Sequence, residues 1–541
     1  MRLHTLLILL PCSLAFQIQF PFKVSELFSK TLSTQAEEAD VSTTHRIAII
    51  GAGAGGSSAS FWISKAKERF GLDVEIDVYE RNDYIGGRST IVYPYNDSSL
   101  PELELGASIF VEANKNLWRA SDEFNLTRRN FHSEDYEAGI WDGKELLFSF
   151  SGGWWDTAKM IWRYGILSPR RVDAYVSSMI KQILLLYSPA SPKWDNITNL
   201  SATLGWIENL NTTTAEYLAK QGVSEKYTNE VVEAATRVNY GQNVNSLHAL
   251  EGAVSMAGTG ANGIKGGNFQ LFEQFLNRSG ANVYLNTPVS SITQKSSASH
   301  LWAVKSPRGT VNYKAVILAA PFHSSTILVP ESISEQVKPQ PYVHLHVTLL
   351  TTTSATPNPE YFGLPASSSV PRMLLTTTQG GKTAPEFNSL SYHGFVRDGE
   401  WAVKIFSAEK ISDEWLDNMF RGKVGWVLRK EWDAYTENPP TLEFPPVKLD
   451  TGFYYVNSFE PYVYRKISFT AILKSYFTRF ISTMETETIS SRNIVELMLN
   501  DEFSSSICGR TISESDENTS ADFQPPTPTN DAPEFIFGWD C

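Results

Sequence analysis

The feature that most constrains this chain is the glycine-rich run 51–56, which reads GAGAGG and stands between a short apolar strand pattern and a helical pattern over 57–69. In such a turn Gly51 permits the tight bend, Gly53 lets a pyrophosphate approach the backbone, and Gly56 lets the helix pack closely on the strand. The start of the helix would offer N–H groups and its positive dipole end to the phosphates. The sequence therefore predicts a Rossmann-type strand–turn–helix unit that binds a dinucleotide.

An acidic residue at the end of the next strand pattern supports this prediction. Residues 74–80 alternate as a strand, and Glu80 lies 24 residues after Gly56, where its carboxylate would accept hydrogen bonds from ribose hydroxyls. A second glycine run over 258–263 has the same spacing, but a helical pattern precedes it, so we expect a loop there. The lack of a second nucleotide motif favours an oxidase that returns electrons to O2 over a reductase driven by NAD(P)H.

Length and charge exclude several classes of protein. A chain of 541 residues is long for one compact core, so two interleaved subdomains are expected. The 59 acidic and 46 basic residues give a net charge of −13, which argues against nucleic acid or an anionic membrane as the main partner. No apolar run is long enough for a transmembrane helix, and no motif predicts a metal site.

The N-terminus is typical of a secretory protein. Residues 1–15 combine a basic start, a short apolar stretch and small residues, which predicts a signal peptide, with a buried N-terminal strand as the alternative. Residues 16–44 are interpreted as a linker. Cys508 and Cys541 would either form one bridge or stay free. Together with the leader, seven Asn-X-Ser/Thr acceptors favour the secretory pathway, ending in a lysosome, a vacuole or the extracellular space. The acceptors are Asn96, Asn125, Asn196, Asn199, Asn211, Asn277 and Asn518.

The order of the remaining patterns predicts an α/β fold, in which a Rossmann-type domain is interrupted by a mixed helical and antiparallel-β substrate domain. The predicted segments are the first part of the dinucleotide-binding domain (45–111), a helical substrate region (112–280), returning strands of the first domain (281–330), an antiparallel-β substrate region (331–450), a C-terminal segment (451–503) and a disordered tail (504–541). The tail is rich in Ser, Thr, Asp, Glu and Pro, although its aromatic end over 535–539 is expected to dock against the protein.

Further motifs resemble the flavoprotein oxidase group that includes monoamine oxidases and phytoene desaturases. Gly86-Gly87-Arg88 follows shortly after Glu80, and residues 105–108 read LGAS. The resemblance implies that the dinucleotide is FAD, with glycines approaching it, an arginine holding its phosphates, and a C-terminal segment closing over the flavin. The implied cofactor contacts are Gly51, Gly53, Gly56, Glu80, Gly87, Arg88, Gly106, Ala107, Ser108, Val289, Met484 and Glu485.

Segments at 104–110, 237–242, 248–256, 266–268 and 482–493 narrow the resemblance to prenylcysteine oxidases, also called prenylcysteine lyases. The resemblance implies a substrate such as farnesylcysteine or geranylgeranylcysteine, which loses hydride from the allylic carbon bonded to sulfur. Addition of water would then give a prenyl aldehyde and free cysteine, while O2 becomes hydrogen peroxide. The protein would need a long apolar tunnel, because each buried CH2 contributes roughly 0.8 kcal/mol.

Three residues are candidates for the substrate side of the site: Arg237, Tyr240 and His248. For Arg237 and His248, a structural role as satisfied buried groups is the alternative. The sequence contains no evident catalytic triad or carboxylate pair. This does not argue against catalysis, because in flavin oxidation the cofactor is the electron sink and the protein mainly orients the donor carbon.

Residues 462–480 interrupt the C-terminal segment and depart from the family pattern. They include four basic residues and no acidic one. They are interpreted as a surface loop, as a basic amphipathic element that contacts a membrane or a partner, or as a retained intron. Two rival functions therefore stay open: an amine oxidase with the same fold, and a catalytically silent flavin-binding protein if the insertion is real.

Overall fold

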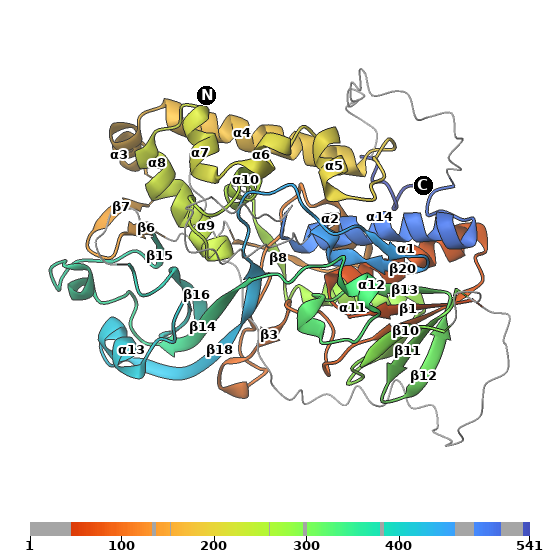
Figure 1. The fold of residues 1–541 in the computed structure, drawn as a ribbon. Coiled ribbons are helices and arrows are strands. Elements are labelled where there is room, and N and C mark those ends of the chain that lie inside the picture. The colour runs from red at the N-terminus through yellow and green to blue at the C-terminus, as the bar shows by residue number, and fades with distance from the viewer. Residues whose placement is uncertain are drawn as a thin grey trace, which may run out of the picture.

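The computed structural model describes residues 45–131, 137–151, 153–258, 260–295, 300–378, 384–459, 481–509 and 534–541. The predicted signal peptide, the linker 16–44 and the insertion 462–480 lie outside the described residues. The described chain forms two blocks that face each other (Figure 1). Each block is built around one large sheet, which confirms the predicted α/β fold.

The first block contains a six-stranded sheet in the order β19-β20-β13-β1-β2-β9. Its strands are β1 (His45–Ile50), β2 (Val74–Tyr79), β9 (Asn282–Tyr284), β13 (Ala315–Leu318), β19 (Lys448–Asp450) and β20 (Phe453–Tyr455). All neighbouring pairs are parallel except β19 with β20. Ile47 and Ile49 face one core and Ala48 and Ile50 face another, because successive side chains of a strand point to opposite faces.

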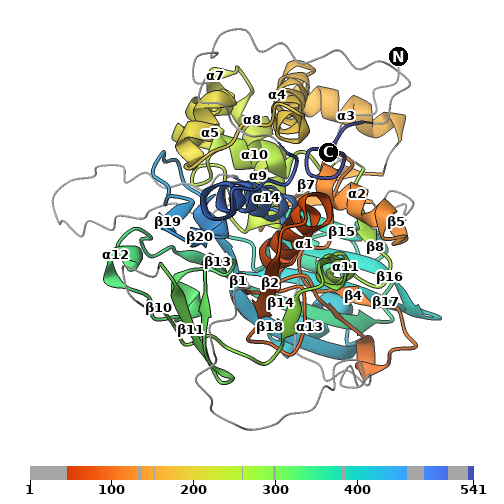
Figure 2. The same ribbon diagram turned by 90° about the vertical axis from the view of Figure 1, so that its right-hand side faces the viewer.

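Helices cover one face of this sheet and a small sheet covers the other. On the first face α1 (Ala54–Phe70) lies beside the C-terminal helix α14 (Met484–Phe503), as Figure 2 shows. The opposite core includes residues of β10 (Ser291–Gln294), β11 (Trp302–Ser306) and β12 (Gly309–Tyr313), which form a three-stranded antiparallel sheet. Burial on both faces explains why residues 47–50 of β1 are all apolar.

The second block contains a seven-stranded sheet in the order β18-β14-β17-β16-β15-β6-β7, with helices packed beside it. Its strands are β6 (Ala138–Trp141), β7 (Leu146–Phe150), β14 (Tyr342–Thr352), β15 (Met373–Thr376), β16 (Ser389–Arg397), β17 (Glu400–Ser407) and β18 (Val424–Thr436). Its helices are α3 (Trp154–Tyr164), α4 (Leu167–Leu184), α5 (Ile197–Thr203), α6 (Ile207–Asn211), α7 (Thr214–Lys220), α8 (Glu225–Tyr227), α9 (Glu233–Tyr240), α10 (Ala249–Ser255) and α13 (Asp413–Phe420).

The remaining α-helices and β-strands are α2 (Lys115–Glu123), α11 (Phe269–Ser279), α12 (Glu331–Ser334), β3 (Ile91–Val92), β4 (Leu103–Glu104), β5 (Arg128–Asn130) and β8 (Asn262–Ile264). Of these, α11 packs against α1 and α12 packs in the core on the opposite face of the first sheet. The predicted helical region 112–280 also supplies β6 and β7 to the second sheet, which the sequence analysis did not anticipate. The second glycine run likewise follows helix α10, but it ends in the short strand β8 rather than in an open loop.

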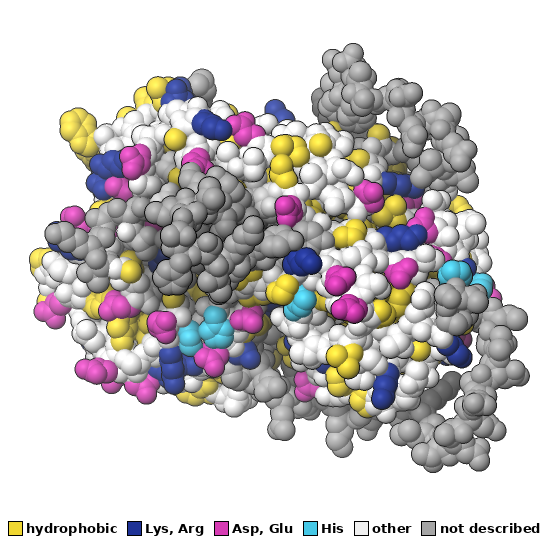
Figure 3. All heavy atoms as spheres, in the orientation of Figure 1, with side chains coloured by type: hydrophobic (Ala, Val, Ile, Leu, Met, Phe, Trp, Pro, Cys, Tyr) yellow, Lys and Arg dark blue, Asp and Glu magenta, His cyan; other side chains and the backbone are white. Residues whose placement is uncertain are grey.

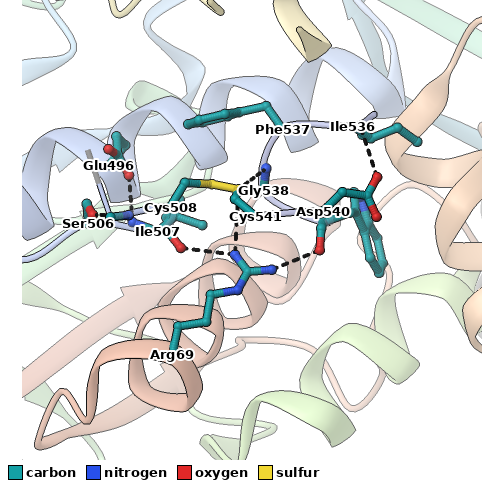
Figure 4. The surroundings of a disulfide bond; sticks show 12 residues. Arg69, Glu496, Ser506, Ile507, Cys508, Ile536, Phe537, Gly538, Asp540 and Cys541 are labelled. Carbon is teal, nitrogen blue, oxygen red and sulfur yellow. Dashed lines mark hydrogen bonds between the residues drawn. A yellow bond between two sulfur atoms is a disulfide. The ribbon is translucent and has the colours of Figure 1, made fainter. Parts of the chain in front are cut away.

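The C-terminal tail corrects the prediction of disorder over 504–541. Residues 504–509 and 534–541 are described, and a disulfide joins Cys508 to Cys541 (Figure 4). Arg69 at the end of α1 donates hydrogen bonds to the carbonyls of Ile507 (2.9 Å) and Trp539 (2.8 Å). The Trp539 ring packs among aromatic rings of α1, α2 and α11. The predicted docking of 535–539 is thus confirmed, whereas the prediction of disorder was wrong for 504–509, which the bridge to Cys541 ties to this docked end.

Candidate cofactor and substrate site

One large cavity lies between the six-stranded sheet and the second block. Its volume is about 640 Å³, which is within the range of small-molecule and cofactor sites. The glycine turn lines it from one side, and β18, the short helix η8 (Val456–Phe459) and the start of α14 line it from another. Because these segments lie far apart in the sequence, the cavity exists only once the first sheet has been completed by the C-terminal part of the chain.

The glycine turn has the geometry of a phosphate cradle. Gly51 has a φ of 110°, and its N–H donates to the carbonyl of Tyr79 at 2.8 Å. A Cβ at Gly56 would lie 1.8 Å from the Gly51 carbonyl oxygen, so only glycine lets α1 approach β1 so closely. A Cβ at Gly53 would meet no atom nearer than Cα of Gly87 at 3.8 Å. No side chain caps α1 and its own first turn has no acidic residue, but a carboxylate oxygen of Glu487 lies 2.7 Å from where a Cβ of Gly55 would stand, so the space for an anion is the one beside Gly53.

Glu80 fixes this turn and also lines the cavity. Its side chain is almost fully buried. One carboxylate oxygen accepts a hydrogen bond from the Ala52 N–H at 2.9 Å, and the other accepts from the backbone and side-chain N–H groups of Asn82 at 2.9 and 2.8 Å. A carboxylate oxygen has two lone pairs, so both are used on the oxygen that accepts from Asn82, while the oxygen that accepts from Ala52 keeps one. The carboxylate can therefore hold the loop and still accept a hydroxyl group of a bound ligand.

The loop after β2 and the adenine-side candidate also reach the cavity. Gly87, Arg88 and Val289 are all among the lining residues. The Arg88 guanidinium donates to the carbonyl of Ala434 at 2.8 Å, which ties this loop to β18 across the cavity. Val289 is buried at the base of the three-stranded sheet, where it offers an apolar surface. These positions agree with the predicted roles, and direct contact with the cofactor stays a prediction.

The LGAS segment divides between two cavities. Gly106 and Ala107 line the large cavity, and Ala107 has a φ of 49°, in the left-handed region. Ser108 instead lines a second cavity of about 50 Å³, where the Lys404 ammonium donates to its hydroxyl at 3.4 Å. Glu104 lines the same small cavity, and burial raises the pKa of its carboxyl group to about 8. Ser108 is therefore not among the residues that line the large cavity, and its predicted contact with the cofactor stays a prediction.

Met484 and Glu485 begin helix α14 at the edge of the large cavity. The Glu485 carboxylate accepts hydrogen bonds from the N–H groups of Asn116 (2.8 Å) and Leu117 (3.0 Å) and from the Tyr187 hydroxyl (2.6 Å). Burial raises the pKa of Glu485 to about 7, although these donors oppose the shift. The carboxylate thus holds the start of α2, so a role for Glu485 in binding the cofactor would rest on its backbone and stays a prediction.

Of the three substrate-side candidates, only Tyr240 lines the large cavity. Arg237 donates to the side chains of Thr376 (2.9 Å), Asn388 (2.8 Å) and Asn243 (3.0 Å), which joins α9 to the second sheet, and burial lowers its pKa to about 10. His248 is fully buried and caps α10 through Nδ1, which accepts from the Glu251 N–H at 3.2 Å. Arg237 and His248 therefore have structural roles, which is the alternative that the sequence analysis left open for both.

Part of the cavity lining is apolar, and we call the side chains that form it the apolar arm. Helix α4 supplies Met179, Ile180 and Ile183, and further lining residues are Leu117, Val254, Phe272, Phe459 and Ile481. The sequence analysis missed these residues because an apolar stripe on a helix has the same spacing whether it faces a core or a cavity. It also missed Tyr435 on β18, whose ring meets the Tyr240 ring edge-on with centroids 5.7 Å apart.

One further cluster lies outside both cavities. His344 and His346 on β14 and Glu431 on β18 place ligand-type atoms within 4.8 Å of one another on the exposed face of the strand pair. His344 Nδ1 also lies 3.1 Å from a carboxylate oxygen of Asp433. The sequence analysis predicted no metal site, and these residues had no motif spacing that would have pointed to one. Among the described helices, none is both long and apolar enough to cross a bilayer.

Comparisons with known proteins agree with this geometry. The family model described as prenylcysteine lyase matches residues 150–507, and the NAD(P)-binding Rossmann-like domain model matches residues 49–124. Farnesylcysteine lyase of Arabidopsis thaliana is 29% identical over 511 residues, which cover 89% of this chain and 94% of that protein. Prenylcysteine oxidase 1 of Mus musculus is 28% identical over 453 residues, covering 77% of this chain and 85% of that protein.

Solved structures share the fold at low sequence identity. Cyclohexylamine oxidase from Brevibacterium oxydans IH-35A superposes with a TM-score of 0.54 at 15% identity, covering 84% of this chain and 99% of that one. Putrescine oxidase bound to putrescine superposes with a TM-score of 0.51 at 14% identity, covering 84% and 99%. At these identities the likeness concerns the fold alone. It shows that the two-block architecture is one that other oxidases share.

Proposed function

Because this chain belongs to the prenylcysteine lyase family, we propose that it is an FAD-dependent oxidoreductase that cleaves the thioether of farnesylcysteine or geranylgeranylcysteine. One observation carries the proposal: a single cavity joins the dinucleotide cradle to an apolar arm. In the balanced reaction, prenylcysteine, O2 and water give a prenyl aldehyde, cysteine and hydrogen peroxide. Bound FAD would supply the oxidant that takes hydride from the carbon next to sulfur.

The residues of the cradle fit FAD. Gly51 and Gly53 leave the backbone of the turn open to a diphosphate, and the bare end of α1 faces the same space. Glu80 would accept a ribose hydroxyl, and Val289 would contact the adenine. Arg88 would add a positive charge near the phosphates, although one of its N–H groups is engaged by β18.

The apolar arm would bind the prenyl chain and keep water away from it. Met179, Ile180 and Ile183 present three neighbouring apolar side chains from one face of α4. Each buried CH2 group of the chain contributes roughly 0.8 kcal/mol, so even a few isoprene units can supply most of the binding free energy. The polar cysteine end would remain near the mouth, and the protein's main catalytic task would be to orient the carbon bonded to sulfur.

Tyr240 and Tyr435 are the residues we propose next to the reacting carbon. Both line the cavity, and their rings meet edge-on. The Tyr240 hydroxyl donates to the Ser482 carbonyl at 3.5 Å, which helps to hold the ring in place. Loss of hydride leaves positive charge on carbon and sulfur, and aromatic ring faces stabilise nearby positive charge. The proposal assigns these rings to charge stabilisation and positioning rather than to proton transfer.

We also propose the secretory pathway, in a lysosome, a vacuole or the extracellular space, as the location. Five of the six acceptor asparagines in the described residues are exposed, and the sixth, Asn196, is half-buried at the start of α5. Asn518 lies outside the described residues. The Cys508–Cys541 bridge supports an oxidising compartment. Treatment of the secreted protein with a glycosidase that removes N-linked glycans should lower its apparent mass, whereas an unchanged mass and a cytosolic location would contradict this proposal.

Anaerobic addition of farnesylcysteine to the purified FAD-containing protein tests the function. We expect the visible absorbance of the flavin to bleach and to return when O2 is admitted, with one peroxide released per aldehyde formed. Putrescine is the matched control substrate, because putrescine oxidase resembles this chain in fold alone. Bleaching by putrescine but not by farnesylcysteine would favour an amine oxidase, and an unchanged spectrum with both would favour a catalytically silent protein.

A further inference from the structure

An exposed apolar surface at the corner between α3 and α4 is separate from both cavities. The side chains that form it are Trp154 (69% exposed), Trp155 (63%), Ile161 (40%), Trp162 (93%), Ile166 (45%) and Leu167 (61%). Ten large apolar side chains are exposed in the described part of the chain, and six of them fall within these 14 residues. We call this set the tryptophan corner. Figure 3 shows apolar side chains gathered at the upper left, where Figure 1 places α3.

Contacts on the opposite face of α3 attach the tryptophan corner to the rest of the protein. The opposite face of α3 buries Asp156, Met160 and Tyr164, which are spaced four residues apart along the helix. The Arg163 guanidinium pairs with the Glu230 carboxylate through two hydrogen bonds of 2.6 and 2.9 Å, and the Tyr164 hydroxyl donates to the same carboxylate at 2.8 Å. The exposed face therefore keeps its orientation, and its apolar surface is not a consequence of an unattached helix.

We propose that the tryptophan corner docks the protein on the surface of a bilayer that contains anionic lipids. Large exposed apolar patches mark interaction sites, and tryptophan is enriched where proteins meet the interface between water and lipid. The 11 residues of α3 make a helix of roughly 16 Å, too short to span a bilayer but suited to lie in its surface with one apolar face down.

Charge supports lipid as the occupant over a second copy of this acidic chain. Residues 154–171 contain the basic residues Lys159, Arg163, Arg170 and Arg171 and one acid, Asp156, so the segment carries a formal charge of +3 in a chain of −13. Lys159 and Arg163 are paired with Asp156 and Glu230, so the charge that faces solvent comes from Arg170 and Arg171, which are exposed at the start of α4 beside the apolar residues; Arg171 also donates to the Gly222 carbonyl. An anionic surface would repel most of this protein and attract this corner, which fixes the orientation of docking.

Helix α4 links the corner to the cavity. It begins at Leu167 in the corner, and its residues Met179, Ile180 and Ile183 line the apolar arm. A substrate with a prenyl chain partitions into bilayers, so docking would bring the arm close to its supply. This last step rests on the proposed function, whereas docking itself does not. Vesicle binding tests the docking and turnover of prenylcysteine tests the proposed function, so the failure of one can be told apart from the failure of the other.

Co-sedimentation of the full-length FAD-containing protein with phosphatidylcholine vesicles, with and without phosphatidylserine, tests the proposal. We expect binding that increases with phosphatidylserine. The Trp154→Ser/Trp155→Ser/Trp162→Ser variant should bind at least about tenfold more weakly, and the Arg170→Glu/Arg171→Glu variant should lose the dependence on phosphatidylserine while keeping the tryptophans. Leu328→Ser, which changes a side chain that is 73% exposed elsewhere, is the matched control and should bind like the wild type.

Three results would overturn docking on lipid. The first is a wild type that sediments with neither vesicle, and the second is a triple variant that binds as tightly as the wild type. The third is a wild-type dimer in analytical ultracentrifugation that the triple variant abolishes while neither protein binds vesicles, which would assign the corner to a second copy. Far-UV circular dichroism and retained flavin absorbance establish that each variant is folded, and brominated lipids that quench wild-type but not triple-variant tryptophan fluorescence would locate the contact.

Discussion

Two glycines of the same turn offer a way to separate cofactor binding from folding. Gly53 has φ −79°, which any residue can adopt, and a Cβ there would meet no atom closer than 3.8 Å. The Gly53→Ala variant should therefore fold as well as the wild type or up to about 1 kcal/mol better, because alanine restricts the unfolded chain. Its methyl group would occupy the space through which a diphosphate reaches the backbone of the turn.

The expected loss of affinity follows from the cost of overpacking. Inserting one methyl group into a close contact costs about 1–3 kcal/mol, which corresponds to a rise in the FAD dissociation constant of roughly 5- to 150-fold. For the Gly56→Ala variant we expect a loss of stability instead. Its Cβ would lie 1.8 Å from the Gly51 carbonyl oxygen and 3.1 Å from Ile49, so α1 must move away from β1. That variant should lose about 3 kcal/mol or more of unfolding free energy even without the cofactor.

Urea unfolding of the apoproteins and titration of each with FAD, followed by flavin fluorescence, measure the two quantities independently. We expect Gly53→Ala to weaken the binding of FAD without lowering the unfolding free energy, and Gly56→Ala to lower the unfolding free energy of the apoprotein. This expectation would be refuted if Gly53→Ala bound FAD with wild-type affinity, because the diphosphate would then not pass against this residue. A loss of more than about 1 kcal/mol in the unfolding free energy of Gly53→Ala would equally refute it, since the turn would then lack the space described.

Three further predictions concern groups around the cavities. Burial raises the pKa of Glu104 from 4.5 to about 8, so its neutral form stabilises the fold below pH 4.5 and this contribution is lost as pH rises through 8. The unfolding free energy of the wild type should therefore fall between pH 4.5 and 8, and that of Glu104→Gln should fall less, as measured by urea titration at several pH values. Cys541→Ser should lower the unfolding free energy by up to about 3–4 kcal/mol, because the bridge closes a loop between residues 33 apart, and a reductant should lower the melting temperature of the wild type but not of this variant. Glu485→Ala should cost about 3 kcal/mol by leaving two N–H groups of α2 and the Tyr187 hydroxyl without their acceptor, and Tyr187→Phe, which removes only the hydroxyl, should cost less in the same unfolding assay.

The part of the site that could be predicted from the sequence consists of local patterns. The run 51–56 and Glu80 lie within one strand–turn–helix–strand segment, so short-range spacing was enough to place them at the cavity. Gly106 and Ala107 were likewise placed at the cavity by their segment. Ser108 was not, because the direction of each side chain in an irregular segment depends on the packing around it, here on Lys404 from a strand almost 300 residues later.

The remaining features depend on contacts between distant segments. Arg237 and His248 were candidates for the substrate side, but the sequence does not show that side chains of other segments satisfy Arg237 or that His248 caps helix α10. The disorder predicted for 504–509 was wrong for a related reason, since composition averages over a segment and does not show that Cys508 is bridged to the docked end that contains Ile536, Phe537 and Trp539. Tyr435 gave no signal because its position opposite Tyr240 is set by the pairing of β18 with β14.

The two helices that begin at the cavity determine which way FAD would lie. Helix α1 follows the N-cap Gly53 and has no acidic residue in its own first turn. Helix α14 is capped by the Thr483 side chain and has Glu485 and Glu487 in its first turn, so a diphosphate would be repelled there. The Glu487 carboxylate also lies beside Gly55, which leaves the open space at Gly53 as the place for a diphosphate. Held there, FAD would have its adenosine toward Glu80 and its flavin toward Gly106, Ala107 and β18, and the reactive ring would then face the apolar part of the cavity lining.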